Sequence, residues 1–304
     1  MIVETVVDVL KAAALLVLLY FLTCLTFSHP FLRKFLRKCV EKLSTRFAEA
    51  NLLILSLTAF ASPMLTYVLI KEGLDKDLKR SVDVVLTVSF ILPFINLFEF
   101  IKFGLIASLA ILTFNLYVLY VLTALFRIAV RFTICHIVYK VLKKFVKTVP
   151  TISITVDEGV GDPVRHALRK TFEFCRSTLI TFVVLSIALI LLSEYVLIPC
   201  LSNVLPLDPT LLTVLISGCS GNILVVLEVV NQLVLDNVLT VEKAIQYIWL
   251  SWLVVSPALH LRRSLPLHVS LFGWRTGLLL LLLCEGSAAV STYVTYVLTL
   301  LTLG

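Results

Sequence analysis

Residues 211–235 read LLTVLISGCSGNILVVLEVVNQLVL, an apolar stretch interrupted at its middle by glycine, serine and asparagine. A membrane-spanning helix needs about 20 mostly apolar residues, so the stretch is long enough for one crossing. The interruption instead favours two half-helices, because glycine is a poor helix former and its exposed backbone needs polar partners that lipid does not provide. We therefore predict a re-entrant hairpin, which enters and leaves the membrane on the same side.

The composition of the whole chain indicates a membrane protein. Of its 304 residues 60% are hydrophobic and 15% charged, with a mean hydropathy of +1.04. Soluble domains have roughly 45–50% apolar and about 25% charged residues, so a water-soluble protein is excluded. The stretches with the length of a span are 12–28, 50–70, 83–101, 103–126, 178–200, 211–235, 244–260 and 271–301.

The distribution of basic residues predicts the topology. If all eight stretches cross, the two sides of the membrane carry 16 and 10 basic residues. If 50–70, which is broken by Ser62-Pro63, and 211–235 are both re-entrant hairpins, the two sides carry 23 and 3 basic residues. With only 50–70 re-entrant, the split is 21 to 5. Basic residues concentrate on the cytoplasmic side of membrane proteins. We expect an all-α polytopic protein of the cell membrane, with about six transmembrane helices plus two re-entrant hairpins. Its termini should lie outside, and the segments expected in the cytoplasm are 30–48, 71–82, 127–177 and 261–270.

This topology predicts an internal repeat. Residues 1–147 form the first membrane repeat, including an amphipathic helix over 30–48, and residues 178–304 form the second. Residues 148–177 form a cytoplasmic linker with a short helix that begins at Asp162-Pro163. Because each half crosses the membrane three times, the second half is inverted relative to the first, an arrangement that recurs in transporters.

The chain resembles the nucleoside-recognition ("gate") membrane family, in particular its two-gate prokaryotic members. The likeness runs from Ser62 to about Arg131 and from about Leu211 to Leu301. The residues that carry it are Ser62-Pro63, Gly73-Leu74, Gly218 to Asn222, Ser256-Pro257, Leu261-Arg262-Arg263-Ser264-Leu265-Pro266, Phe272-Gly273 and Gly277-Leu278. The resemblance implies a permease-like protein that moves a nucleoside or another small solute.

The interrupted segments supply the candidate substrate-binding residues. Half-helices that end near the membrane midplane present free backbone groups and dipole ends to a polar ligand. The candidates are Ser62, Asn96, Ser217, Gly218, Ser220, Gly221, Asn222 and Asn231. An equally good interpretation of the second hairpin is structural: its glycines allow close helix packing, and its serines bond back to carbonyl groups.

Two carboxylates within apolar segments are candidates for coupling to an ion. Glu228 shares a helix face with Asn231 and Gln232, and Glu285 lies near the middle of the last span. An intramembrane carboxylate is costly unless it faces protein or water, and it can bind a cation or take up a proton. A structural hydrogen-bond network is the alternative for both. For Glu99 we expect a local ion pair with Lys102.

The function we expect is permeation of a small polar solute, nucleoside-like or ionic, by alternating access. One alternative is a membrane scaffold that does not transport; another is an intramembrane serine protease using Ser220 and His260. The seven cysteines are scattered, so we expect no metal site, and we expect no cofactor and no catalytic residues. The expected partners are membrane lipid, the solute, a coupling ion and further copies of the chain, but not nucleic acid.

Overall fold

The structure is a computed structural model that describes residues 2–28, 52, 55–56, 58–59, 62–73, 81–146, 162–192, 208–219 and 223–303. Its α-helices are α1 (Ile2–Ser28), α4 (Pro63–Gly73), α5 (Ser81–Glu99), α6 (Ile106–Ile111), α7 (Phe114–Lys143), α8 (Pro163–Phe174), α9 (Ile180–Leu192), α11 (Pro209–Cys219), α12 (Ile223–Leu235) and α13 (Val241–Leu303). Two π-helical segments, η2 (Phe100–Leu105) and η3 (Cys175–Leu179), continue α5 and α8. No strand occurs in these ranges, which confirms the predicted all-α class.

Among the described residues, four helical runs are long and apolar enough to cross a membrane. They are Ser81–Ile111, Phe114–Lys143, Val241–Arg262 and Ser264–Leu303. On the surface of α7 the large apolar side chains of Leu122, Leu125 and Ile137 are exposed. Such side chains suit contact with lipid, so the fold agrees with the membrane class predicted from composition.

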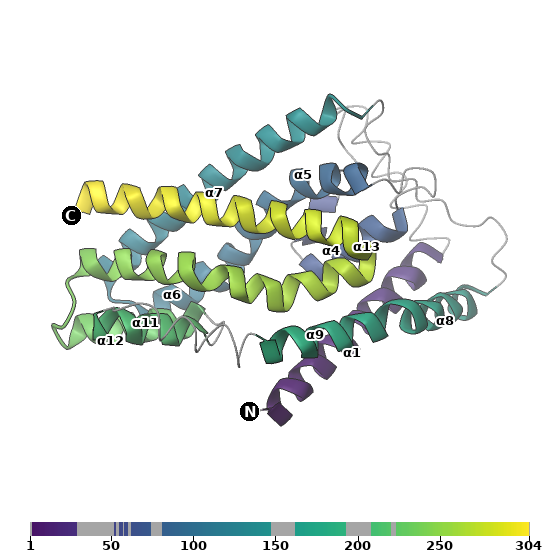
Figure 1. Ribbon diagram of the computed structural model, residues 1–304, viewed down its shortest axis with the longest axis horizontal. Helices are drawn as coiled ribbons and strands as arrows, with labels where there is room; N and C mark the ends of the chain where they lie inside the picture. Colours follow the sequence, from purple (N-terminus) through teal and green to yellow (C-terminus); the bar gives the residue numbers. More distant parts are fainter. Residues whose placement is uncertain are drawn as a thin grey trace. The chain divides into compact units, whose positions relative to one another are not determined.

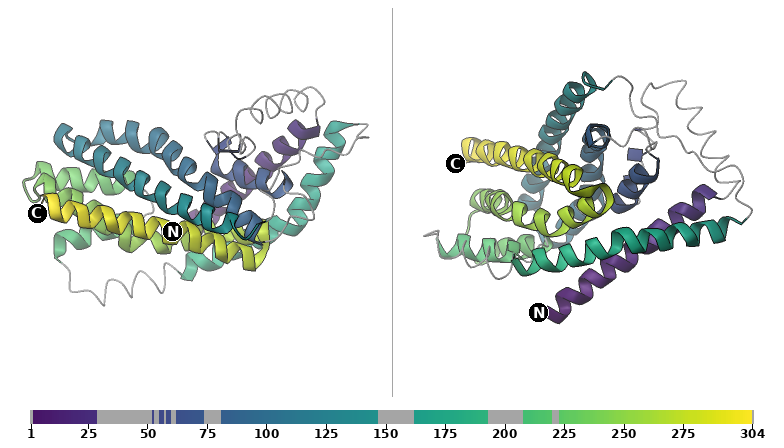
Figure 2. Two further views of the ribbon diagram at one scale, coloured as in Figure 1. Left: turned by 90° about the horizontal axis from the view of Figure 1, so that it is seen from above. Right: turned by 45° about the vertical axis from the view of Figure 1, so that its right-hand side comes forward.

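The described chain forms two compact units. The first comprises Met1–Ile95, Val138–Ala188 and Leu265–Leu280. Within it α1 packs against α8 and α4, and the two views of Figures 1 and 2 show α1 crossing α8. The rings of Tyr20 and Phe174 stack with their centroids 4.0 Å apart at this crossing.

The second unit comprises Asn96–Ile137, Leu189–Ser264 and Leu281–Gly304. Here α11 and α12 lie side by side, and α12 also packs against α6 (Figure 1). Its core includes the fully buried side chains of Leu116 on α7 and Leu227 on α12. This unit contains the polar groups on which the rest of the account depends.

Two helices begin with the dipeptide Asp-Pro. Asp162 Oδ1 accepts a hydrogen bond from the backbone N–H of Val164 at 2.9 Å, which confirms the predicted N-cap of α8. Before α11, Asp208 Oδ1 accepts from the backbone N–H of Thr210 at 3.2 Å, and Oδ2 accepts from the Tyr247 hydroxyl at 3.0 Å. The bonds from Thr210 and Tyr247 hold the pKa of Asp208 below its ordinary value.

The predicted boundary between helices 83–101 and 103–126 is wrong. The helix runs without a break from Ser81 to Ile111, and Lys102 lies inside it. The chain leaves helical geometry at Leu112, with φ −88° and ψ 146°, where Asn231 Oδ1 accepts from the N–H of Thr113 at 2.9 Å. A lysine does not require a helix end, because its long apolar stem can carry the charge away from the helix.

Residues 261–270, which we expect in the cytoplasm, are helical. The chain reverses at Gly273, where φ is +80° and ψ is 168°. A Cβ atom on Gly277 would lie 2.8 Å from the backbone nitrogen of Val269, so the two arms of α13 approach closely beside this reversal. Only glycine adopts such a backbone conformation without strain, which places the turn at Gly273.

Backbone hydrogen bonds on either side of Pro63 bear on the predicted reversal at Ser62-Pro63. The N–H of Ser62 donates to the carbonyl of Thr58 at 3.1 Å, and the N–H of Thr66 donates to the carbonyl of Ser62 at 3.2 Å. Both bonds have the i to i−4 spacing of an α-helix. A proline removes one such bond and bends a helix without necessarily ending it. Helical bonds therefore flank Pro63, but residues 60 and 61 lie outside the described part of the chain, so the hairpin stays a prediction.

Some predictions fall on residues that the structure does not describe. They concern the amphipathic helix over 30–48, most of the linker over 148–161, and the hairpin tip formed by Ser220, Gly221 and Asn222.

Candidate functional site

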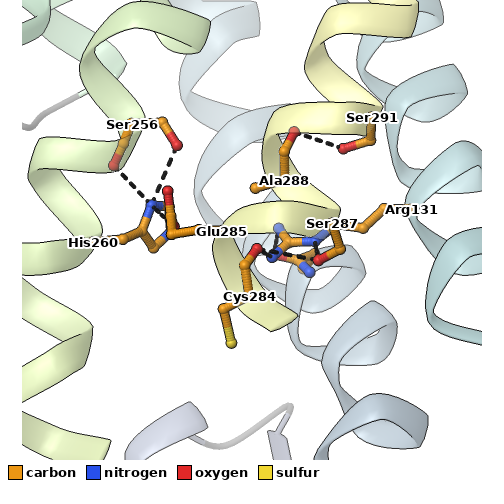
Figure 3. A network of polar contacts seen from close by, with 9 residues as sticks. Arg131, Ser256, His260, Cys284, Glu285, Ser287, Ala288 and Ser291 are labelled. Carbon is orange, nitrogen blue, oxygen red and sulfur yellow. Dashed lines mark hydrogen bonds and ion pairs between the residues drawn. The ribbon is translucent and has the colours of Figure 1, made fainter. Parts of the chain in front are cut away.

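Arg131 on α7 is a buried cation in the second unit, with 5% of its surface exposed. Its guanidinium donates three hydrogen bonds: Nε to Ser287 Oγ at 3.1 Å, Nη1 to Asn96 Oδ1 at 2.8 Å, and Nη2 to the carbonyl oxygen of Cys284 at 2.8 Å (Figure 3). All three acceptors are neutral. The charge of Arg131 is thus stabilised by oriented dipoles, which is how a buried guanidinium can remain ionised without a carboxylate at its side.

Further charges lie near Arg131. Glu99 interacts electrostatically with Arg131, His260, Lys102 and Arg127. The predicted local pair of Glu99 with Lys102 is therefore part of a larger group of charges drawn from three helices.

His260 and Glu285 form the second half of the site. His260 Nδ1 lies 2.6 Å from Glu285 Oε1 across the two arms of α13, with 26% and 16% of the side chains exposed (Figure 3). The same nitrogen lies 3.0 Å from the carbonyl oxygen of Ser256. Apart from the contact with His260, the two buried carboxylate oxygens of Glu285 have no hydrogen-bond partner among the described residues. At this N–O distance a hydrogen bond joins the imidazole and the carboxylate.

The two halves of the site meet on one helix. Cys284, whose carbonyl oxygen accepts from Arg131, directly precedes Glu285. A shift of this part of α13 would therefore affect both the Arg131 bonds and the His260–Glu285 contact.

The geometry around His260 is not that of a serine protease triad. Ser256 Oγ lies 3.3 Å from His260 Nδ1, the same nitrogen that contacts Glu285. In a triad the nucleophile and the acid contact opposite nitrogens of the imidazole, so that one nitrogen takes the proton while the other is held. The predicted alternative nucleophile, Ser220, lies outside the described residues.

Most of the polar site lies in the middle of long helices. Asn96, Arg131 and Glu285 are each at least 11 residues from the nearest end of their candidate spans, whereas His260 lies two residues before the end of the span Val241–Arg262. At about 1.5 Å per residue, 11 residues are about 16 Å, roughly half of the 30 Å hydrocarbon core. If these helices span a bilayer, Arg131 and Glu285 lie near its midplane, where ionisable groups usually serve a function.

The structure gives packing roles to several of the predicted substrate-binding residues. Ser217 Oγ donates to the carbonyl oxygen of Val214 at 2.7 Å, and a Cβ atom on Gly218 would lie 2.7 Å from Ser251 Oγ. Asn231 accepts from the backbone at the break between α6 and α7. These contacts agree with the structural interpretation of this hairpin.

The remaining predicted residues differ in their position and burial. Ser62 Oγ accepts weakly from the N–H of Leu65 at 3.4 Å, in the first unit. Asn96 belongs to the Arg131 site. Of the two predicted coupling carboxylates, Glu285 is buried against His260, whereas Glu228 is exposed on α12.

Arg131 and His260 are the site residues that sequence reasoning missed. Arg131 falls in the segment 127–177 that we expect in the cytoplasm, and His260 is named only in the protease alternative. The signal that could have identified both residues is a polar side chain within a long helical run. In the ranges the structure describes, no group of three His, Cys, Asp or Glu side chains could hold a metal ion.

No family model matches this chain, and neither a curated protein nor a solved structure does. The argument for function therefore depends on the site itself.

Proposed function

We propose that this chain is a multi-pass permease of the cell membrane that moves a small polar solute together with protons. The observation that carries the proposal is the His260–Glu285 contact of 2.6 Å, held beside the buried cation Arg131 within apolar helices. An ionisable pair in such a place has a high energetic cost, and in membrane proteins it commonly belongs to a proton relay.

The chemistry of the pair supports proton coupling. When either partner moves, the hydrogen bond between the imidazole and the carboxylate breaks, and each group can then exchange a proton with its surroundings. Because His260 and Glu285 lie on opposite arms of the α13 reversal, a change in the spacing of the arms would alter their contact. Such a change is a physical means of linking proton binding to an alternating conformation.

The helices α11 and α12 support a re-entrant hairpin as part of this proposal. They contain 11 and 13 residues, or about 17 and 20 Å of helix, and each is shorter than the hydrocarbon core of about 30 Å. The two lie side by side. The matching hairpin around Ser62 is not part of the proposal and stays a prediction. The inverted repeat and the relation to the gate family remain predictions.

Uptake into proteoliposomes tests the proposal. The purified chain is reconstituted, and uptake of labelled nucleosides, purine bases and small organic anions is measured with and without an imposed pH gradient. We expect at least one solute to accumulate only with the gradient, and Glu285→Gln to abolish that accumulation. Glu228→Gln, which alters an exposed carboxylate, is the matched control and should leave it intact. No gradient-dependent uptake of any solute by the folded protein would favour the scaffold alternative.

A further inference from the structure

A second arginine lies one helical turn before Arg131 on α7. Arg127 is half-buried, and its Cζ atom lies 5.4 Å from the ring centroid of Trp249. Trp249 is only 3% exposed and stacks against Tyr120 with ring centroids 5.9 Å apart. The guanidinium is thus held against an aromatic face, a favourable arrangement for a cation.

Both members of this contact retain an unused donor. Arg127 Nε and Trp249 Nε1 are buried, and neither has a hydrogen-bond partner among the described residues. The contact with the ring face stabilises the charge of Arg127 but does not use either N–H group. Buried donors without acceptors are rare in folded proteins, and each calls for an explanation.

The comparison with Arg131 shows which arginine is available to a ligand. Arg131 donates from Nε, Nη1 and Nη2 to protein acceptors, so its role is to hold helices together. Arg127 makes no such bond in the described part of the chain. The charges that act on Glu99 are the three cations Lys102, Arg127 and Arg131, together with His260, so cations outnumber this carboxylate.

We propose that Arg127 and Trp249 form a binding site for an oxyanion, the carboxylate or phosphate group of a small solute. A carboxylate or phosphate has at least two oxygens and can accept from both unused N–H groups, while its charge pairs with the guanidinium. The side chain of Arg127 is half-buried, whereas its Nε atom and Trp249 Nε1 are both buried. The binding site does not depend on the proposed function. Only the identification of its ligand with the transported solute rests on that function.

Calorimetric titration of the purified full-length protein in detergent tests the site. The probes are benzoate against its neutral amide, benzamide, and inorganic phosphate against chloride at equal ionic strength. We expect benzoate or phosphate to bind and benzamide and chloride not to bind, and the stronger of the two oxyanions identifies the class of ligand. Equal binding of benzoate and benzamide, or no binding of either oxyanion, would overturn the proposal without any variant.

The variants locate the site. Arg127→Gln should weaken oxyanion binding by at least about tenfold, the loss expected for a charge-assisted hydrogen bond. Trp249→Phe keeps an aromatic ring and removes the N–H, and it should weaken binding by a smaller factor. Lys140→Gln, an exposed lysine on the same helix, is the matched control and should leave binding unchanged. Wild-type affinity in folded Arg127→Gln protein would refute the assignment to this arginine.

The two proposals can fail separately. Oxyanion binding that depends on Arg127, without uptake of any solute, would retain the site and refute transport. Uptake that Arg127→Gln leaves unchanged would retain transport and refute the site.

Discussion

The bond between Arg131 and Asn96 offers a quantitative test of the buried site. Asn96→Leu removes the acceptor at 2.8 Å and leaves one N–H of a buried guanidinium without a partner. A hydrogen bond to a charged group contributes about 1.5–3 kcal/mol in soluble proteins, whereas cycles in a helical membrane protein average about 0.6 and reach about 1.7 kcal/mol. Because Arg131 is ionised and 5% exposed, we expect a coupling energy of about 1–2 kcal/mol.

A double-mutant cycle isolates this energy. The free energy of unfolding is measured in mixed micelles for the wild type, Asn96→Leu, Arg131→Met and the double variant. The double variant should be more stable than the sum of the single losses implies, because it leaves neither partner unsatisfied. The pair Asn96→Leu with Lys140→Met, which alters an exposed lysine on α7, is the control and should be additive. Additivity of Asn96→Leu and Arg131→Met within about 0.5 kcal/mol would refute the bond.

Three further outcomes are expected. Gly277→Ala should lower the free energy of unfolding by about 1–3 kcal/mol, because a Cβ atom there would lie 2.8 Å from backbone. Gly286→Ala, where a Cβ atom meets nothing within 4 Å, should not destabilise the protein, and equal effects of the two variants would contradict the close approach. Because the pKa of Asp208 is lowered in the folded protein, its ionised carboxylate stabilises the fold fully above the unfolded-state pKa near 3.8. This stabilisation is lost as the pH falls through the folded-state pKa, so the free energy of unfolding between pH 2 and 6 should depend less on pH in Asp208→Asn. Cysteine labelling of Arg46→Cys and Lys71→Cys should reach both positions from the same face of the membrane, as the predicted hairpin over 50–70 requires, and labelling from opposite faces would contradict that hairpin.

Composition and local signals predicted the class of the fold and several helix ends. The apolar content required membrane helices, and Asp162-Pro163 predicted a helix start that the structure confirms, because an N-cap depends only on adjacent residues. The break at Leu112 could not be predicted in this way. It depends on the side chain of Asn231, which lies 118 positions away in sequence.

The same distinction separates the predicted from the missed site residues. Glu285 was identified because a carboxylate within an apolar stretch is conspicuous in any sequence. Its partner His260 appears only in the protease alternative, because no local signal predicts that the reversal at Gly273 brings the two arms of α13 together. Arg131 was missed because the rule that basic residues mark the cytoplasmic side describes loops, and Arg131 lies within a helix whose neighbours supply its acceptors.

Proton movement measured during solute uptake tests the central claim most directly. Proteoliposomes carry a pH-sensitive dye in the lumen, and the solute identified by the uptake screen is added outside. The account predicts that the lumen acidifies with the wild-type protein, that Glu285→Gln removes the acidification, and that Glu228→Gln preserves it. Solute uptake without acidification, or acidification that persists in Glu285→Gln, would contradict it.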